Sequence, residues 1–143
     1  MITRLTIVGI MVRDQDEALR FYTETLGFEK RTDQNFGPGW RWLTVAPKDQ
    51  KEVEITLMKP DASMFGEERA RILTDQIGKA PTWSYSTDDC RKTYEELLAK
   101  GVKFSSLPTE EFYGIEAVFE DLYGTPISMV ELSSELRERM ESR

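Results

Sequence analysis

The order of strand and helix patterns in this chain of 143 residues occurs twice. Each copy begins with an alternating apolar strand, continues with a helix that starts at an aspartate and stops at a glycine, and ends with three strands. The helix boundaries are Asp14 and Gly27 in the first copy and Asp89 and Gly101 in the second. Sequence identity between the copies is slight, so the repeat rests on element order and on these boundary residues. This order predicts two βαβββ modules.

The first copy has clear signals for its helix. Asp14 follows a strand pattern at 4–13, and Glu17 lies three residues on, which is a capping-box arrangement. The helix is expected to run to about Leu26, with an apolar face that includes Ala18 and Tyr22. Further strands are expected near 28–34, 39–46 and 52–59, with turns at Phe36–Gly39 and Ala46–Lys51.

A bridge and the second copy follow. The bridge is expected to be helical from about Gly66 to Ile77. The second copy predicts a strand at 82–87, a helix from Asp88 and Asp89 to about Lys100, and strands at 102–106, 114–120 and 126–132. We therefore predict an α+β fold in a single domain of two βαβββ modules: module one 3–60, bridge helix 61–80, module two 81–132 and C-terminal helix 133–143. Each sheet has one helix-covered face, and the two sheets are expected to form a curved mixed sheet cup.

Composition narrows the possible partners. The formal net charge is −7, and an acidic surface repels phosphate backbones, so no nucleic-acid partner is expected. No apolar run approaches the roughly 18 residues needed to span a bilayer, so no membrane partner is expected. The single cysteine, Cys90, fits a reducing compartment and predicts a cytoplasmic protein.

The chain contains no histidine, which limits nucleophilic chemistry. Cys90 begins a predicted helix, where the helix dipole lowers the pKa of a thiol, but without a histidine base we expect it to be inert. Ser84 and Ser128 likewise have no histidine partner, which excludes a Ser-His-Asp mechanism.

Three segments carry a family resemblance. They read VGIMVRDQDEALRFYTETLGFE from Val8, TDDCRKTYEELLAKGVKF from Thr87 and DLYGTPISMVEL from Asp121. Together they resemble the two modules of the vicinal oxygen chelate superfamily, which includes glyoxalases, bleomycin-resistance proteins and extradiol dioxygenases. The resemblance covers about residues 3–132 and implies the glyoxalase/bleomycin-resistance fold, commonly assembled as a homodimer.

The resemblance also implies where a metal would bind. Metal-dependent members carry a histidine on the first strand and a carboxylate on the fourth strand of each module. Those positions correspond here to Ile7 and Glu54 in module one and to Thr82 and Ser128 in module two. One carboxylate with two hydroxyls is a poor donor set for a transition metal. We therefore expect no metal ligands and no cofactor, and glyoxalase or extradiol chemistry cannot run in its usual form.

Strand alternation predicts which side chains face the cup. Apolar, aromatic and hydroxyl side chains alternate there with a carboxylate, which is typical of a small-molecule pocket. On strand 114–120, Glu116 and Glu120 share a face, but the pattern leaves open which face that is. The candidate ligand-binding residues are Ile7, Met11, Trp40, Trp42, Glu54, Thr56, Thr82, Ser84, Ser128 and Tyr113, with Phe36, Met64, Phe65 and Phe112 as further rim candidates.

Three functions remain open from the sequence. The first is a metal-independent small-molecule binding protein that holds an aromatic or cationic ligand in the sheet cup at a dimer interface. The second is a lyase- or isomerase-type or other enzyme of the superfamily, with Glu54 as a catalytic general base or in a non-standard metal site. Glu54 could instead be a strand carboxylate that is solvated or paired with Arg41. The third function is a non-catalytic partner or regulatory domain that binds through the bridge helix and the charged tail.

Overall fold

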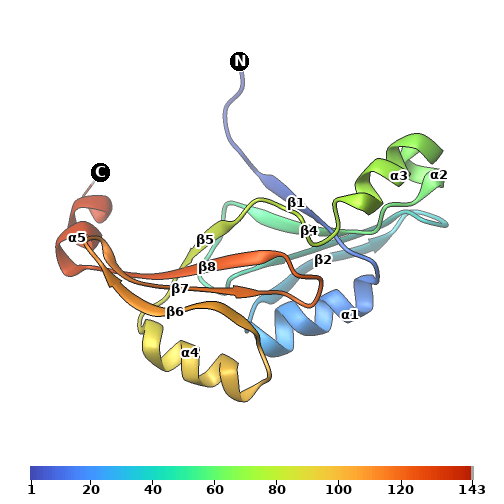
Figure 1. Cartoon of the computed structure of the whole chain (residues 1–143). Coiled ribbons are helices and arrows are strands. Elements are labelled where there is room, and N and C mark those ends of the chain that lie inside the picture. The colour runs from blue at the N-terminus through green and yellow to red at the C-terminus, as the bar shows by residue number, and fades with distance from the viewer. Residues whose placement is uncertain (143) are drawn as a thin grey trace. The chain divides into compact units, whose positions relative to one another are not determined.

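The computed structural model describes residues 1–142, and these fall into two compact units that divide between Ala80 and Pro81. Each unit contains a four-stranded mixed sheet with an α-helix on one face (Figure 1). The predicted α+β class and the repeated βαβββ order are therefore confirmed.

The first unit contains one sheet with the strand order β1-β4-β3-β2. Strand β1 pairs with β4 in parallel, whereas β4, β3 and β2 pair antiparallel. This pattern arises because the helix between β1 and β2 carries the chain across the sheet, after which hairpin turns suffice. The elements are β1 (Ile7–Met11), α1 (Gln15–Arg20), the π-helical turn η1 (Phe21–Thr25), β2 (Glu29–Asn35), β3 (Arg41–Ala46), β4 (Glu54–Met58), α2 (Ala62–Phe65) and α3 (Glu67–Asp75).

The core of the first unit lies between its sheet and α1. The inner strands β3 and β4 each contain a run of consecutive buried residues, and the buried positions of α1 and η1 are Ala18 and Tyr22. Burying one such apolar side chain contributes about 1.5–3 kcal/mol to stability. The buried strand residues on the face toward α1 are Ile10, Leu43, Val45, Ile55 and Leu57.

The second unit repeats this arrangement with the strand order β5-β8-β7-β6, in which β5 and β8 are parallel. Its core includes a ring cluster in which Tyr94 of the helix meets Phe104, and Phe104 meets Phe119, at centroid distances of 4.7 and 5.3 Å. Each such ring pair adds about 0.5–1.5 kcal/mol beyond area burial. The elements are β5 (Trp83–Ser86), α4 (Cys90–Ala99), β6 (Phe104–Glu111), β7 (Gly114–Glu120), β8 (Pro126–Leu132) and α5 (Ser134–Glu141).

The helix starts follow the predicted capping residues. The Asp14 carboxylate accepts a hydrogen bond from the backbone N–H of Glu17 at 2.9 Å, and Asp89 accepts from that of Lys92 at 3.0 Å. Both helices are followed by a glycine with positive φ, Gly27 and Gly101. The two aspartates therefore cap the N-termini of α1 and α4 in the same way.

Several element boundaries differ from the expectations. The bridge contains a helix, α2, ahead of the expected one; Gly66 with φ +81° separates it from α3, and α3 ends at Asp75 rather than Ile77. Strand β6 begins at Phe104 and extends to Glu111, past the expected end at Ser106, because it pairs with the whole of β7. The C-terminal helix α5 ends at Glu141, and position 143 of the expected helix lies outside the described residues.

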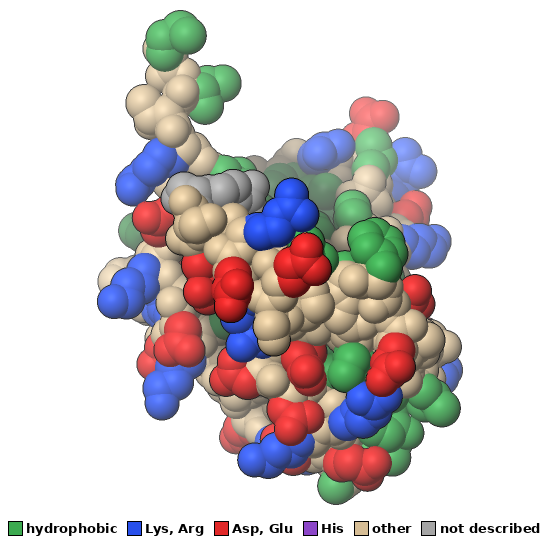
Figure 2. All heavy atoms as spheres, turned by 90° about the vertical axis from the view of Figure 1, so that its left-hand side faces the viewer, with side chains coloured by type: hydrophobic (Ala, Val, Ile, Leu, Met, Phe, Trp, Pro, Cys, Tyr) green, Lys and Arg blue, Asp and Glu red, His purple; other side chains and the backbone are tan. Residues whose placement is uncertain are grey.

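The surface of the protein is mixed in charge. Acidic and basic side chains are interspersed on the face shown in Figure 2, in keeping with a net charge of −7 made of 26 acidic and 19 basic residues. Within residues 1–142, no helix has both the length and the apolar character that crossing a membrane requires.

Candidate functional site

The face of the first sheet turned away from α1, here called the open face of unit one, carries most of the candidate residues from module one. The register places Ile7 beside Glu54, and Met11 beside Met58. Thr56 of β4 lies beside Thr44 of β3, and both are buried. Ile7, Met11, Glu54 and Thr56 therefore share one continuous surface, as the strand alternation indicated.

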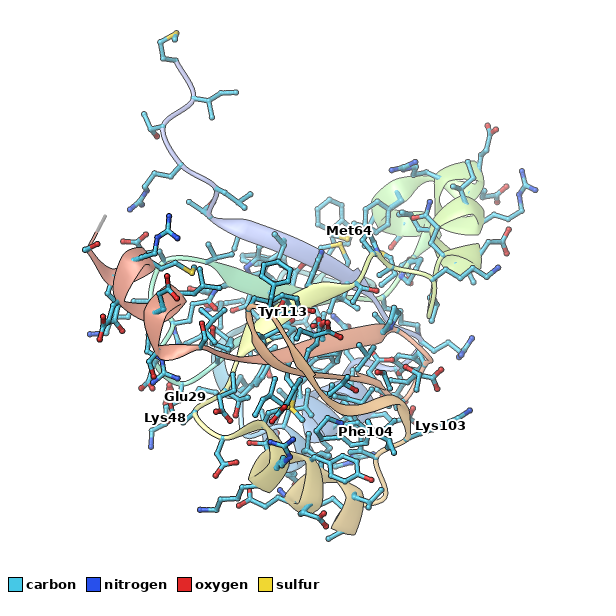
Figure 3. The ribbon with its side chains drawn as sticks, turned by 60° about the vertical axis from the view of Figure 1, so that its left-hand side comes forward. Glu29, Lys48, Met64, Lys103, Phe104 and Tyr113 are labelled. Atoms are coloured by element: carbon cyan, nitrogen blue, oxygen red, sulfur yellow. The ribbon has the colours of Figure 1, made fainter. Side chains whose placement is uncertain are left out.

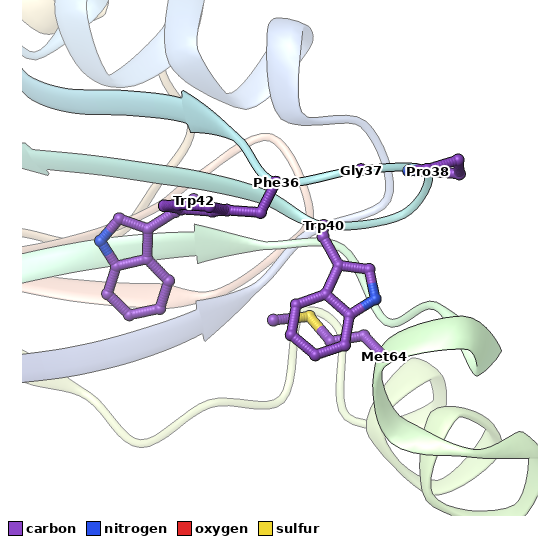
Figure 4. A pocket seen from close by; sticks show the side chains of 6 residues that line it. All are labelled: Phe36, Gly37, Pro38, Trp40, Trp42 and Met64. Carbon is purple, nitrogen blue, oxygen red and sulfur yellow. The ribbon is translucent and has the colours of Figure 1, made fainter.

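A groove with a volume of about 720 Å³ opens at one end of unit one (Figure 4). Its lining is aromatic and apolar and contains no charged side chain: Phe36, Gly37, Pro38, Trp40, Trp42 and Met64. Trp40 is 42% exposed and Phe36 is 67% exposed, so much of this aromatic surface is accessible. Exposed aromatic surface in a concave site is typical of small-molecule binding.

The groove wall is held by contacts between the β2–β3 turn and α2. The Ser63 hydroxyl shares its single proton between two acceptors, the Asp61 Oδ1 atom at 2.6 Å and the backbone carbonyl of Pro38 at 3.2 Å. Asp61, the N-cap of α2, also accepts from the Ser63 backbone N–H at 2.8 Å. The hydroxyl bond and then the backbone bond from Ser63 lower the pKa of Asp61. Gly39 has φ +75°, and a Cβ atom there would lie 2.6 Å from the Asp61 Oδ1 atom. A side chain at this position would therefore collide with the Asp61 and Ser63 side chains unless they shift, and the close approach of the turn to α2 brings Met64 to the same groove as the tryptophans.

Glu54 lies on β4 at the position where the family resemblance expects a carboxylate ligand. It accepts a hydrogen bond from the Thr44 hydroxyl at 2.6 Å. The expected alternative, an ion pair with Arg41, is wrong. Arg41 instead donates to Asp33 at 2.9 and 3.0 Å and to Asp16 at 2.8 Å. The alternation of β3 explains this, because Arg41 and Leu43 face α1 whereas Thr44 faces the open side.

In the second unit, Ser84 and Ser128 lie side by side on the open face, which is the face turned away from α4. They are register partners, with 3.5 Å between their hydroxyl oxygens. Ser84 is therefore the residue that corresponds to Ile7, because it lies beside the fourth-strand position as Ile7 lies beside Glu54. The expected equivalence of Thr82 is wrong, since Thr82 precedes β5 and is exposed.

Glu116, whose face was unassigned, joins this pair. Its carboxylate accepts from the Ser128 hydroxyl at 2.5 Å and from the Tyr113 hydroxyl. These two bonds lower the pKa of Glu116, the Ser128 bond most, and the bond to Glu116 raises the pKa of Tyr113 to about 12. Figure 3 shows Tyr113 on the side of the sheet opposite Phe104, which packs toward α4. The Glu116 carboxylate is therefore held ionised on the open face.

The two units place a hydroxyl and a carboxylate at the same two sheet positions, with the roles exchanged. Thr44 and Thr56 are register partners, as are Glu116 and Val130, so Thr44 and Glu116 are equivalent. Glu54 and Ser128 are equivalent as well, because each lies beside the matching residue of the first strand in its unit. In unit one the hydroxyl lies on the third strand and the carboxylate on the fourth, and in unit two the order is reversed.

The donor set at the family's ligand positions does not fit a divalent transition metal. These positions hold Ile7, Glu54, Ser84 and Ser128, and the one carboxylate is engaged by Thr44. A transition metal needs several convergent imidazole, thiolate or carboxylate donors. In the part of the chain that the structure describes, no three histidine, cysteine, aspartate or glutamate side chains form such a group.

The thiol of Cys90 is buried at the start of α4. The expected lowering of its pKa by the helix dipole is wrong. Burial raises the pKa of this thiol, and the negative charge of Glu131 raises it further. Glu131 also accepts a hydrogen bond from the Cys90 backbone N–H at 2.9 Å, and so occupies the helix end.

The candidate residues thus fall into separate groups. Trp40 and Trp42 line the groove together with Phe36 and Met64, whereas Phe65 and Phe112 do not line it. Tyr113, Ser84 and Ser128 lie in the second unit, around Glu116. Glu116 is the residue that the sequence reasoning missed. The buried neighbours Ala117 and Phe119 could have assigned its face, because alternation turns Glu116 away from them.

Each βαβββ unit pairs its first and fourth strands in parallel, and the first unit also carries an aromatic groove. Together these features point to one class of protein. Residues 4–129 match the family model described as Glyoxalase/Bleomycin resistance protein/Dioxygenase superfamily. The chain belongs to this superfamily, and the resemblance seen in the sequence is confirmed.

Individual relatives agree with this assignment. The uncharacterized protein YurT of Bacillus subtilis (strain 168) is 36% identical over 90% of this chain and 98% of its own length. The crystal structure of UcmS2 matches with a TM-score of 0.80 at 42% identity and covers 92% of this chain and 99% of that chain. TnmS3, an antibiotic binding protein from Streptomyces sp. CB03234, matches with a TM-score of 0.75 at 29% identity and covers 92% of this chain and 98% of its own.

Proposed function

We propose that this protein is a metal-independent small-molecule binding protein whose ligand carries a flat aromatic ring system. The observation that carries the proposal is the groove, in which two tryptophans, a phenylalanine and a methionine surround about 720 Å³ without any charged side chain. Stacking on indole rings and contact with a thioether favour aromatic ligands over aliphatic ones. The similarity to TnmS3, an antibiotic binding protein, supports a ligand of natural-product size.

The construction of the groove supports binding rather than transient contact. The β2–β3 turn and α2 are joined by the hydrogen bond from Ser63 to the Pro38 carbonyl, and Asp61 orients Ser63 for it. A site that is already shaped loses less conformational entropy when a ligand enters, which raises affinity. The ligand's aromatic part therefore meets Trp40, Trp42 and Met64 in a fixed arrangement.

The proposal includes a homodimer in the cytoplasm. Apolar side chains at the start of the chain, Met1, Ile2 and Leu5, are each at least 65% exposed, which suits contact with a second copy. The buried free thiol of Cys90 fits a reducing compartment. Sedimentation velocity at micromolar concentration is expected to give a dimer, and a monomer would contradict this part.

The binding proposal is tested with Nile red, a neutral planar dye, followed by displacement with a panel of polycyclic aromatic antibiotics. Trp42→Ala is expected to weaken dye binding by at least about tenfold, since a central aromatic side chain contributes about 2 kcal/mol or more. Phe112→Ala is the matched control, because it removes a ring that is 92% exposed and lies in the other unit.

The outcomes separate the candidate functions. Equal affinities in both variants and the parent protein would show that the groove is not the binding site. Chemical conversion of a displacing compound, followed by mass spectrometry and lost in Glu54→Gln, would instead favour an enzyme that uses Glu54 as a base. Recovery of every compound unchanged, with tight binding, supports sequestration.

A further inference from the structure

Glu116 is an ionised carboxylate on the open face of unit two, and no ion pair involving it is found within residues 1–142. Other carboxylates on neighbouring positions are engaged differently. Glu120 on the same strand lies 3.7 Å from the Lys103 ammonium group, and Glu131 accepts from the backbone N–H of Cys90. Glu116 is bonded only by uncharged hydroxyls, which orient its charge without neutralising it.

The carboxylate of Glu116 has acceptor capacity for a further partner. A carboxylate has about four acceptor sites, and the hydroxyls of Tyr113 and Ser128 occupy one on each oxygen. Its cross-strand neighbours are Thr109 on β6 and Val130 on β8, and Ser84 lies beyond Ser128. Tyr113 lies at the β6–β7 turn (Figure 3), and its hydroxyl reaches the Glu116 carboxylate.

The repeat gives an independent reason to treat this arrangement as a site. The halves of the chain share little sequence, yet both keep a hydroxyl bonded to a carboxylate at the same two sheet positions. A hydroxyl–carboxylate pair would not be needed for packing, since two apolar side chains fill such positions at less desolvation cost.

We propose that Glu116, Ser128 and Tyr113 form a second ligand subsite, which takes a planar organic cation of the amidinium or guanidinium type. The fork of N–H donors on such a cation matches the two oxygens of a carboxylate. Its flat face stacks on a tyrosine ring, where the cation–π attraction adds to the hydrogen bonds. The subsite lies in a different unit from the tryptophan groove and does not depend on ligand binding there.

Benzamidinium and benzamide are the probes, because they share size and shape and differ in charge. Both are titrated into the full-length, ¹⁵N-labelled protein and followed by NMR. Benzamidinium is expected to shift the amide signals of Tyr113, Glu116 and Ser128, and to bind at least about tenfold more tightly than benzamide, since an ionic hydrogen bond in this setting is worth about a factor of ten or more.

Matched variants locate the effect. Glu116→Gln removes the charge and is expected to weaken benzamidinium binding by at least about tenfold, to the level of benzamide. Glu120→Gln removes a charge from the same strand and is expected to leave the affinity unchanged, because that carboxylate is paired with Lys103. Trp42→Ala is expected to leave the benzamidinium shifts unchanged as well, which separates a failure here from a failure of the groove proposal.

Three results would overturn the proposal. The first is equal affinity for benzamidinium and benzamide in the parent protein. This measurement does not depend on whether any variant folds. The second is benzamidinium shifts confined to residues near other carboxylates. The third is equal weakening by Glu116→Gln and Glu120→Gln, which would indicate general attraction to an acidic protein.

Discussion

A Gly39→Ala substitution tests whether the β2–β3 turn and α2 together form the wall of the groove. Gly39 has φ +75°, a left-handed conformation that costs an L-residue about 1–2 kcal/mol. The added Cβ atom would also lie 2.6 Å from the Asp61 Oδ1 atom, well inside contact distance. Either the turn moves away from α2 or the Asp61 and Ser63 side chains rotate, and in both cases we expect the hydrogen bond from Ser63 to the Pro38 carbonyl to be lost.

The expected loss in the free energy of unfolding is the sum of two effects. The backbone conformation costs about 1–2 kcal/mol, and a lost hydrogen bond of this kind costs about 1 kcal/mol. We therefore expect Gly39→Ala to lower the free energy of unfolding by about 2–3 kcal/mol, measured by urea denaturation. Nile red affinity is expected to fall as well, because the turn carries Phe36 and Pro38, and α2 carries Met64.

Gly27→Ala is the matched control for this substitution. Gly27 has φ +78°, but no atom lies within 4 Å of a Cβ atom placed there. It therefore carries the backbone cost of about 1–2 kcal/mol without the collision, and leaves the groove intact. Equal destabilisation of the two variants, with unchanged dye affinity in Gly39→Ala, would refute the proposed wall.

Two further predictions concern the caps and the subsite. Asp14→Ala and Asp89→Ala each remove an N-cap bond, so each is expected to lower the free energy of unfolding by about 1 kcal/mol in urea denaturation; a negligible loss in either variant would contradict the shared capping role. The bond to Glu116 raises the pKa of Tyr113 to about 12 from an ordinary value of 10.0, so its stabilising contribution is fully present below pH 10.0 and is lost as the pH rises through about 12. Tyrosinate absorbance is expected to lose a late-ionising tyrosine in Tyr113→Phe, with Tyr85 still titrating near 12; an unchanged titration curve would contradict this.

Local patterns in the sequence were sufficient for the order of the elements within the two βαβββ units and for the starts of α1 and α4. Asp14 and Asp89 are recognisable as caps because the interaction spans only three residues. The core faces of the strands follow from alternation, as Leu43 and Val45 show. These features depend on neighbours along the chain, and such neighbours can be read directly.

The equivalent of Ile7 in unit two and the partner of Arg41 are set by contacts between segments that lie far apart in the sequence. The choice between Thr82 and Ser84 depends on the register of β5 against β8, which are separated by more than forty residues. The partner of Arg41 depends on where α1 lies, since Asp16 comes from that helix. Local patterns favoured Thr82 as the equivalent of Ile7 and Arg41 as the partner of Glu54. Contacts between distant segments show that both predictions are wrong.

The exchanged hydroxyl–carboxylate pairs bear on how a carboxylate is accommodated on each open sheet face. A carboxylate there is costly when it has no partner, because burial removes part of its hydration. A neighbouring hydroxyl is that partner in each unit, Thr44 for Glu54 and Ser128 for Glu116. Each carboxylate is thereby oriented and only partly engaged, which leaves acceptor sites for a ligand that bears N–H donors.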